Sequence, residues 1–254
     1  MKPYLKNYCT IGKIMYLLAM VELSVYDFFK GDFAMTRPPH FDFLNTLNPT
    51  LAYLGSALLL ICIVMVWFNL YGSYALICMI GLIFLLATSR HILNQWRDSI
   101  NGFKSLWLIS GAVLVLTEYA DYTKYRGRVL YTNMIILSVF FYLCGIAHFQ
   151  YPVFCRDLIM DFIPLRMFFV YLAGVCLLLG SIGILIPRYQ KTALWLLGMQ
   201  ILGWFILLHL PRAFTLSGDD WIGVGESLAV SGICFMMYDL LGKGDLKIEM
   251  GEFS

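Results

Sequence analysis

The chain has 254 residues, of which 60% are hydrophobic and only 13% are charged, and its formal net charge at neutral pH is +2. So few polar residues exclude a soluble globule, and the mean hydropathy of +0.76 indicates an integral membrane protein. The small net charge, without a clustered basic face, argues against nucleic-acid binding. The seven cysteines form no CxxC pair and do not by themselves encode a thiol-redox site.

Apolar runs with few charges predict about eight transmembrane helices, because a span needs about 20 apolar residues. The first run is interrupted by Glu22 and Asp27, and the fourth is short. In chain order, the predicted spans cover residues 14–29, 50–68, 72–88, 105–120, 133–149, 167–186, 192–209 and 224–241.

An internal repeat divides these spans into two sets of four. Residues 51–60 resemble residues 169–178 in one register, and the offset that carries Tyr53 onto Tyr171 also carries His91 onto His209. The sequence therefore predicts an all-α membrane protein of two tandem four-helix bundles, over 1–125 and 126–254. Because each copy has an even number of spans, the two share one orientation, and a pseudo-twofold axis should run along the membrane normal.

The distribution of Lys and Arg favours both termini on the cytoplasmic side of the inner membrane. On the opposite side, aspartates dilute the positive residues of the connections. The first span has no small-residue cleavage site after its apolar core, so we expect it to be retained as a signal anchor. The cytoplasmic assignment rests on Lys2, Lys6, Lys13, Lys124, Arg126, Arg128, Arg188 and Lys191.

Polar residues at bilayer depth are candidates for function, because a charge there costs on the order of 3 kcal/mol and usually faces a partner or a cavity. Glu22 lies in the middle of the first span. It either relays a proton beside a bound ligand or hydrogen-bonds a neighbouring helix. Asp27 lies near the end of the same span, where we expect it to be solvated.

The histidines give a second set of candidates. His91 and His209 stand near the external ends of spans three and seven, and Arg212 follows His209 closely. They either contact a quinone carbonyl or an anionic lipid headgroup, or they cap helix ends at the interface. His148, at the end of the fifth span, has the same alternatives. Haem ligation would need two imidazoles that face each other.

Metal and catalytic motifs are not found in the sequence. No Cys or carboxylate stands at ligand spacing beside a histidine, so no metal site is predicted. The phosphate-binding loop, the nucleophile elbow and the HExxH motif are also missing. We therefore expect no catalytic activity from this chain on its own.

Four short motifs stand in the second copy: CGIAHF at 144–149, FIPLR at 162–166, YLAG at 171–174 and LHLP at 208–211. Through these motifs the second copy resembles the DoxX-like family of four-helix bacterial membrane proteins. The resemblance covers roughly 133–241 and, less closely, 14–120. In the first copy, Asp27 stands where the second has His148, and no Pro follows His91.

The resemblance implies a four-helix bundle, here doubled, and an association with respiratory or redox complexes. Some relatives are described as subunits of a quinone-reducing thiosulfate oxidoreductase, and others as partners in oxidative-stress complexes. We therefore expect a membrane subunit of a redox complex that offers a quinone or lipid pocket and binds other proteins, and quinone is the cofactor that this interpretation implies. The alternatives are a non-catalytic anchor or assembly partner, and a binder or transporter of a small molecule or lipid.

Overall fold

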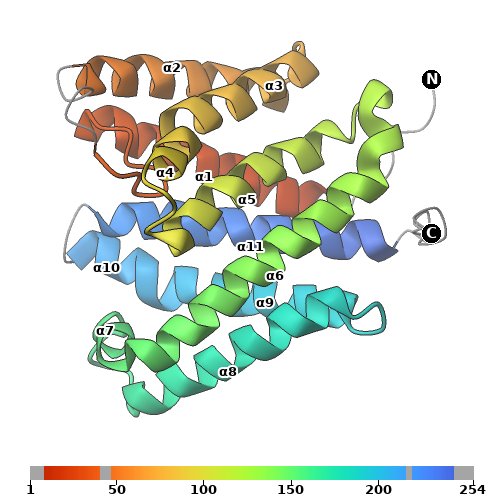
Figure 1. Ribbon diagram of the computed structural model, residues 1–254. Helices are drawn as coiled ribbons and strands as arrows, with labels where there is room; N and C mark the ends of the chain where they lie inside the picture. The colour runs from red at the N-terminus through yellow and green to blue at the C-terminus, as the bar shows by residue number, and fades with distance from the viewer. Residues whose placement is uncertain (1–8, 41–46, 216–218, 243–254) are drawn as a thin grey trace.

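The computed structural model describes residues 9–40, 47–215 and 219–242, and all regular secondary structure in these residues is helical (Figure 1). Two short π-helical turns, η2 and η4, and one 3-10 helix, η3, connect α-helices. In chain order, the elements are α1 (Cys9–Lys30), α2 (Asn48–Trp67), α3 (Gly72–Ile83), η2 (Phe84–Thr88), α4 (Ser89–Leu93), α5 (Ser99–Leu116), η3 (Ala120–Tyr125), α6 (Arg126–Gln150), α7 (Pro152–Asp157), α8 (Arg166–Leu185), α9 (Gln190–Trp204), η4 (Phe205–His209), α10 (Leu210–Thr215) and α11 (Asp220–Gly242).

Seven helical segments of the described chain are long and apolar enough to cross a membrane. Helix α1 forms over the predicted first span but is not one of the seven, and Lys13, Glu22 and Asp27 interrupt its apolar sequence. The seven segments are Asn48–Trp67, Gly72–Leu93, Ser99–Leu116, Asp121–Gln150, Arg166–Leu185, Gln190–Thr215 and Asp220–Gly242.

Several helices begin before their predicted spans. The fourth span is predicted at 105–120, whereas helix α5 begins six residues earlier, at Ser99, and ends at Leu116. Its start is fixed by Asp98, whose side chain accepts the backbone N–H of Asn101 as an N-cap. The helix therefore includes Lys104, which hydropathy alone had left outside the apolar run.

The order of the long helices is the same in the two halves of the chain, although the short helix α7 of the second half has no counterpart among the described residues of the first. In each half a long helix is followed by a second helix, then by a third that passes through a π-helical turn, and then by a final helix. The turns η2 and η4 occupy corresponding places in this order. Such turns inside α-helices often lie near functional sites.

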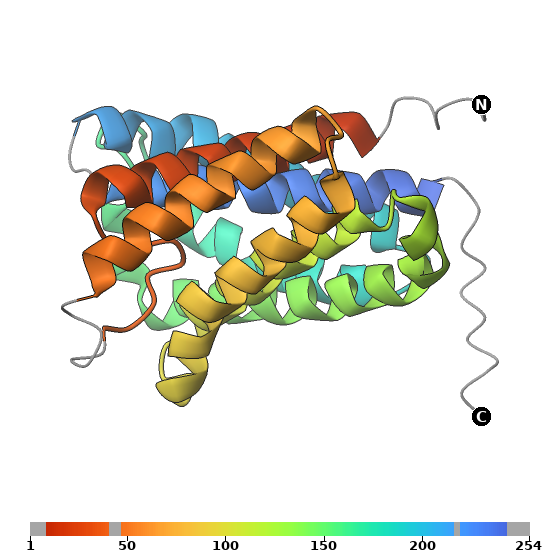
Figure 2. The same ribbon diagram turned by 90° about the horizontal axis from the view of Figure 1, so that it is seen from above.

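The first helix, α1, packs lengthwise against the last, α11 (Figures 1 and 2). Their backbones come into contact at two glycines: a Cβ added to Gly232 would lie 2.5 Å from the carbonyl oxygen of Gly12, and one added to Gly12 would lie 2.4 Å from the carbonyl oxygen of Gly232. In a bilayer such small residues permit the close approach that van der Waals packing requires. This contact joins the beginning of the first half to the end of the second.

A polar contact fastens the other end of the α1–α11 pair. The Nζ atom of Lys30 lies 2.5 Å from Oδ1 of Asp219, and the hydroxyl of Tyr26 donates to the same oxygen at 2.6 Å. These two donors hold the pKa of Asp219 below its ordinary value. The pair is largely exposed, so it contributes little stability.

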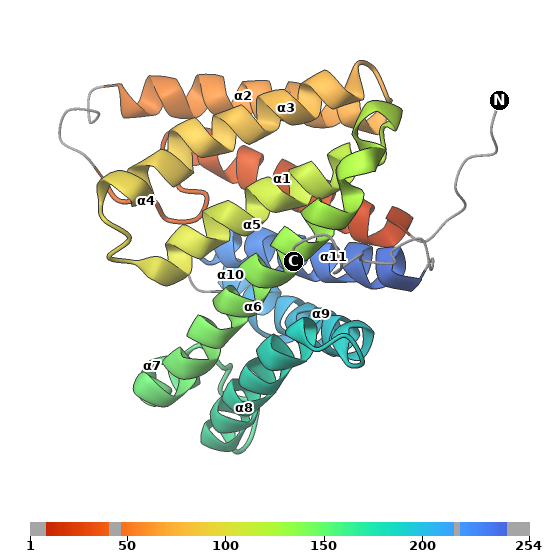
Figure 3. The ribbon, with the colours of Figure 1, turned by 45° about the vertical axis from the view of Figure 1, so that its right-hand side comes forward.

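Helices α8 and α9 lie on the side of the molecule away from α2 and α3 (Figure 3). Helix α8 packs on α6 and α9, and α9 packs on α11. The two halves thus meet along α1 and α11 and where α5 adjoins α6, while α8 keeps one face open.

Substitution Gly232→Ala is expected to destabilise the protein by about 1–3 kcal/mol, because the new methyl group would meet the backbone of α1. The matched control is Gly203→Ala, at a helical position where a Cβ would meet nothing within 4 Å. The control should be neutral or stabilising by up to about 1 kcal/mol. Thermal unfolding of both variants in detergent makes the comparison, and equal midpoints would contradict the close α1–α11 contact.

Candidate functional site

A largely apolar cavity of about 1120 Å³ lies against α8 and α9. Its walls include Leu172 and Leu179 of α8 and Leu196 of α9, and residues of the connection after α7 close one side. A cavity of this size and character suits a ligand with a large apolar part. Because α8 and α9 are both membrane-spanning segments by length and composition, such a ligand can enter from the lipid.

Three of the five candidate residues from the sequence line this cavity: His148, His209 and Arg212. His148 comes from the last turn of α6, His209 ends η4 and Arg212 lies in α10. The ring of Trp204 stacks on that of His148, with centroids 5.7 Å apart and planes 23° apart. The structure thus brings these three polar residues, which come from three helical segments, to the wall of one cavity.

Both imidazoles keep ring nitrogens available. His148 Nδ1 lies 2.7 Å from the carbonyl oxygen of Cys144, which leaves Nε2 without a partner among the described residues. His209 lies against Gly223 of α11, where a Cβ would come within 2.5 Å of its Nδ1. Gly223 therefore makes room for this ring, whose nitrogens form no hydrogen bond with the described residues.

Arg212 is engaged with the protein. Its Nε donates to Oδ1 of Asp220 at 3.1 Å, and one Nη donates to the carbonyl oxygens of Asp157 and Leu158 at 3.1 and 3.5 Å. These bonds connect α10 to α11 and to the end of α7. Arg212 therefore shapes the wall of the cavity by holding three elements together.

A buried ion cluster lies behind His209. Glu226 of α11 is only 5% exposed, and its Oε2 accepts from Lys104 Nζ at 2.6 Å and from Arg37 at 3.1 Å. Glu226, Lys104 and Arg37 are also the charges that act most strongly on His209. Arg37 reaches the surface and His209 lines the cavity, so the charges of the cluster act on a residue of the cavity wall.

Glu22 lies beside this cluster and does not line the cavity. Its Oε2 is buried without a hydrogen-bond partner and rests against α11, where a Cβ on Gly225 would lie 2.0 Å away. Glu226 is the like charge that acts on Glu22. Two carboxylates thus adjoin at the α1–α11 contact, and only Glu226 is paired with cations.

His91 lies outside the cavity, so the structure does not bring it to His209. The residue is 1% exposed and packs under the segment that follows α1. Its ring stacks on Trp96 at a centroid distance of 6.4 Å. The Nε2 atom is buried without a hydrogen-bond partner.

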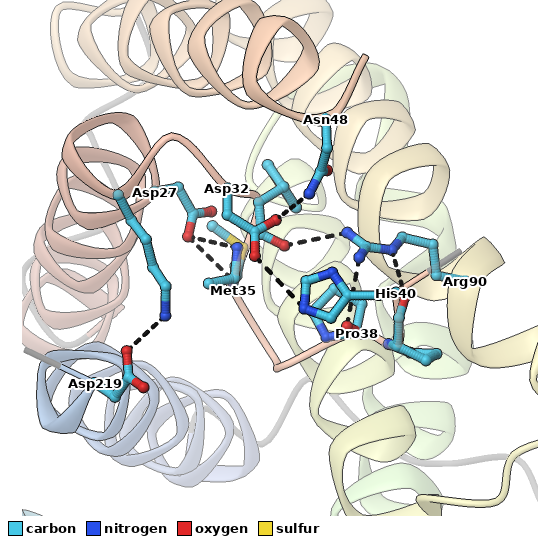
Figure 4. Close-up of polar contacts among 12 residues, drawn as sticks. Asp27, Asp32, Met35, Pro38, His40, Asn48, Arg90 and Asp219 are labelled. Atoms are coloured by element: carbon cyan, nitrogen blue, oxygen red, sulfur yellow. Dashed lines mark hydrogen bonds and ion pairs between the residues drawn. The ribbon is translucent and has the colours of Figure 1, made fainter. Parts of the chain in front are cut away.

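The expectation that Asp27 is solvated is wrong. Asp27 is completely buried, and its Oδ1 accepts the backbone N–H groups of Ala34 and Met35 at 2.9 and 3.0 Å (Figure 4). The segment after α1 folds back over the helix end and covers the carboxylate. Hydropathy along α1 cannot indicate this cover, because it comes from residues beyond the helix.

The covering segment is fixed by Arg90, which also appears in Figure 4. The guanidinium donates from Nε to the carbonyl oxygen of Pro39 at 2.8 Å and from a Nη to that of Phe33 at 3.4 Å. Thr36 and Arg37 within the segment have φ angles of 63° and 46°, a region that β-branched and bulky residues rarely adopt. From this segment the guanidinium of Arg37 reaches Glu226 at 3.1 Å.

Glu226 and Lys104 are not among the candidate residues predicted from the sequence. Glu226 falls within the predicted eighth span, where a single carboxylate in an apolar helix was the same signal that identified Glu22. Lys104 lies just before the predicted fourth span. Nothing in the sequence indicates that these two residues pair, because 122 positions separate them.

No protein-family model, curated protein or solved structure matches this chain. Within the described residues, no group of three or more His, Cys, Asp or Glu side chains could hold a metal ion. The chemistry of the site therefore follows from its geometry: an apolar chamber, two imidazoles and an adjoining buried ion cluster.

Substitution Lys104→Met is expected to lower the free energy of unfolding by roughly 2–3 kcal/mol, because it removes a hydrogen bond to a buried charge. Combined with Glu226→Gln, it should cost less than the sum of the two single changes, since the carboxylate that Lys104 neutralises is then gone. Chemical or thermal unfolding in detergent gives the required free energies.

The matched control is Lys13→Met. It breaks the ion pair of Lys13 with Glu118, which has the similar separation of 2.7 Å but leaves both side chains about a quarter exposed. A loss below about 1 kcal/mol is expected for this pair. Equal losses for Lys104→Met and Lys13→Met would show that burial of Glu226 adds nothing to its ion pairs.

Proposed function

We propose that this multi-pass membrane protein binds a lipophilic small molecule, a quinone or a lipid, in the cavity beside α8 and α9. The proposal rests on one observation: a chamber of about 1120 Å³ with apolar walls contains two imidazoles that have free ring nitrogens. The walls suit the tail of such a ligand, and the imidazoles suit its polar head. In this proposal the chain serves as a membrane subunit of a redox or respiratory-type complex, and partner proteins carry the electrons.

The buried ion cluster supports a quinone over a purely structural lipid. Reduction or oxidation of a quinone moves protons as well as electrons. His209 lines the cavity, the charges of Glu226 and Lys104 act on it, and the charge of Glu226 acts in turn on Glu22. These residues offer proton-exchanging groups close to the bound head of the ligand.

The DoxX-like resemblance and the tandem arrangement belong to the same proposal. We infer two four-helix units, over 1–125 and 126–254, with α1 as the eighth span and both termini on the cytoplasmic side of the inner membrane. The common order of elements in the two halves, with η2 and η4 at corresponding places, supports the duplication.

A second function has one observation in its favour. Few buried charges would argue against an ion-coupled transporter, but Glu226, Asp27 and Arg90 are all buried. Transport of a small molecule or lipid coupled to proton movement is therefore the alternative. Ligand release coupled to a pH gradient in vesicles, without any redox partner, would favour this alternative.

Substitution Ala173→Phe is expected to lower ligand affinity by about tenfold or more, because the ring would occupy the cavity. Val175→Phe is the matched control: it lies two residues away on α8, is exposed, and is not part of the cavity wall. Purified wild type should carry a quinone or lipid in its organic extract, as measured by mass spectrometry. The control should retain that ligand and Ala173→Phe should lose it.

Co-purification distinguishes the redox subunit from a simple anchor. A stoichiometric redox protein recovered with the wild type in mild detergent is expected. Equal ligand content in Ala173→Phe and Val175→Phe would contradict the cavity as the binding site. A ligand-free wild type that brings down non-redox proteins would instead identify an anchor or assembly partner.

A further inference from the structure

The hydrogen bond of His148 fixes what this residue can offer to a ligand. A carbonyl oxygen has only lone pairs, so the 2.7 Å contact with the Cys144 carbonyl requires the hydrogen on Nδ1. The singly protonated ring then carries a lone pair on Nε2. His148 therefore presents an acceptor on its unpartnered side, where the ring lines the cavity.

A second proton on His148 would find no compensation. Among the described residues, the ring hydrogen-bonds the Cys144 carbonyl and stacks on Trp204, and no ion pair reaches it. A cationic imidazolium would lie against largely apolar walls, and an unpaired charge is unfavourable in such surroundings. The acceptor form is the one that the cavity favours.

The other polar side chains at the cavity can donate as well as accept. Gln200 directs one amide N–H to the carbonyl oxygen of Ala173 at 3.5 Å, which leaves its second N–H and its side-chain oxygen. Arg212 donates from Nε and one Nη to protein oxygens and keeps its other Nη. His148 Nε2 is therefore the position at which only an acceptor is offered, and a ligand that brings only acceptors would leave it unpaired.

We infer that the ligand of this cavity is a lipophilic hydroxyl compound, such as a hydroquinone or an alkylphenol, whose O–H donates to His148 Nε2. This inference rests on the proposed binding function and specifies its ligand class. An oxidised quinone offers only carbonyl acceptors and cannot donate this bond. The contact with His148 therefore favours the reduced form, and a reaction that reduces quinones or one that consumes quinols must supply or remove its ligand.

A matched pair of probes isolates the hydroxyl hydrogen. 4-Dodecylphenol and 4-dodecylanisole share ring and tail, and the methyl ether keeps an acceptor oxygen but lacks the O–H. Their affinities for the purified full-length protein are measured in nanodiscs by competition against radiolabelled 4-dodecylphenol. The phenol is expected to bind about tenfold more tightly, the effect of one hydrogen bond to a buried acceptor.

Two variants assign the preference to a residue. His148→Phe keeps an aromatic ring against Trp204 but removes the acceptor, and it should bring the two affinities within about twofold of each other. Gln200→Leu removes the neighbouring acceptor and should leave the preference intact. The wild-type comparison needs neither variant, so it tests the inference even if His148→Phe does not fold.

The outcomes separate this inference from the function on which it rests. If neither probe binds the wild type, the cavity does not bind lipophilic ligands and the proposed function fails. If both bind equally, the cavity binds ligands but the hydroxyl inference is overturned. A preference that survives His148→Phe and disappears in Gln200→Leu would overturn the role of His148.

Discussion

The close approach of α1 and α11 is the contact on which the rest of the structure depends. Gly12 and Gly232 allow the two backbones to touch, and Gly225 receives the carboxylate of Glu22. Because the first and last helices are joined in this way, residues far apart in the chain share one interior. The same contact sets Glu22 beside Glu226, and it leaves α8 and α9 on the side of the molecule where the cavity lies. A larger side chain at any of these glycines would push α1 away from α11 and would also move Glu22 away from Glu226.

The buried charges follow from this arrangement, and they are stabilised by specific partners. Glu226 is paired with two cations from other segments, and Asp27 is held by two backbone N–H groups. A charge within a membrane is unfavourable without such partners, so each one indicates a function or a packing requirement. Asp27 and Arg90 shape the segment after α1, which in turn carries Arg37 to Glu226. The cluster then adjoins His209, so that ionisable groups and an apolar ligand chamber meet at one residue.

Much of the fold could be predicted from the sequence, because hydropathy over about 20 residues is a local property. Seven of the eight predicted spans form helices that are long and apolar enough to cross a membrane. The first predicted span forms helix α1, and its passage through the membrane remains a proposal. His148, His209 and Arg212 could also be chosen in advance, since polar residues at the ends of apolar helices are conspicuous. The partners of the buried charged residues could not be predicted in this way. Asp27 is buried by a segment outside its helix, and Lys104 meets Glu226 only after the halves pack together. Such pairs depend on tertiary contacts, which no local pattern records.

The central claim is that the cavity beside α8 and α9 is where a lipophilic ligand binds. Photolabelling tests this most directly: a quinol analogue with a diazirine on its tail is activated in nanodiscs, and the attachment sites are mapped by mass spectrometry. The account predicts labels on cavity-lining residues of α8 and α9, such as Ala173 and Cys176, that disappear with excess unlabelled ligand. Labels spread equally over the lipid-facing residues of α2 and α3, and unaffected by competitor, would contradict it.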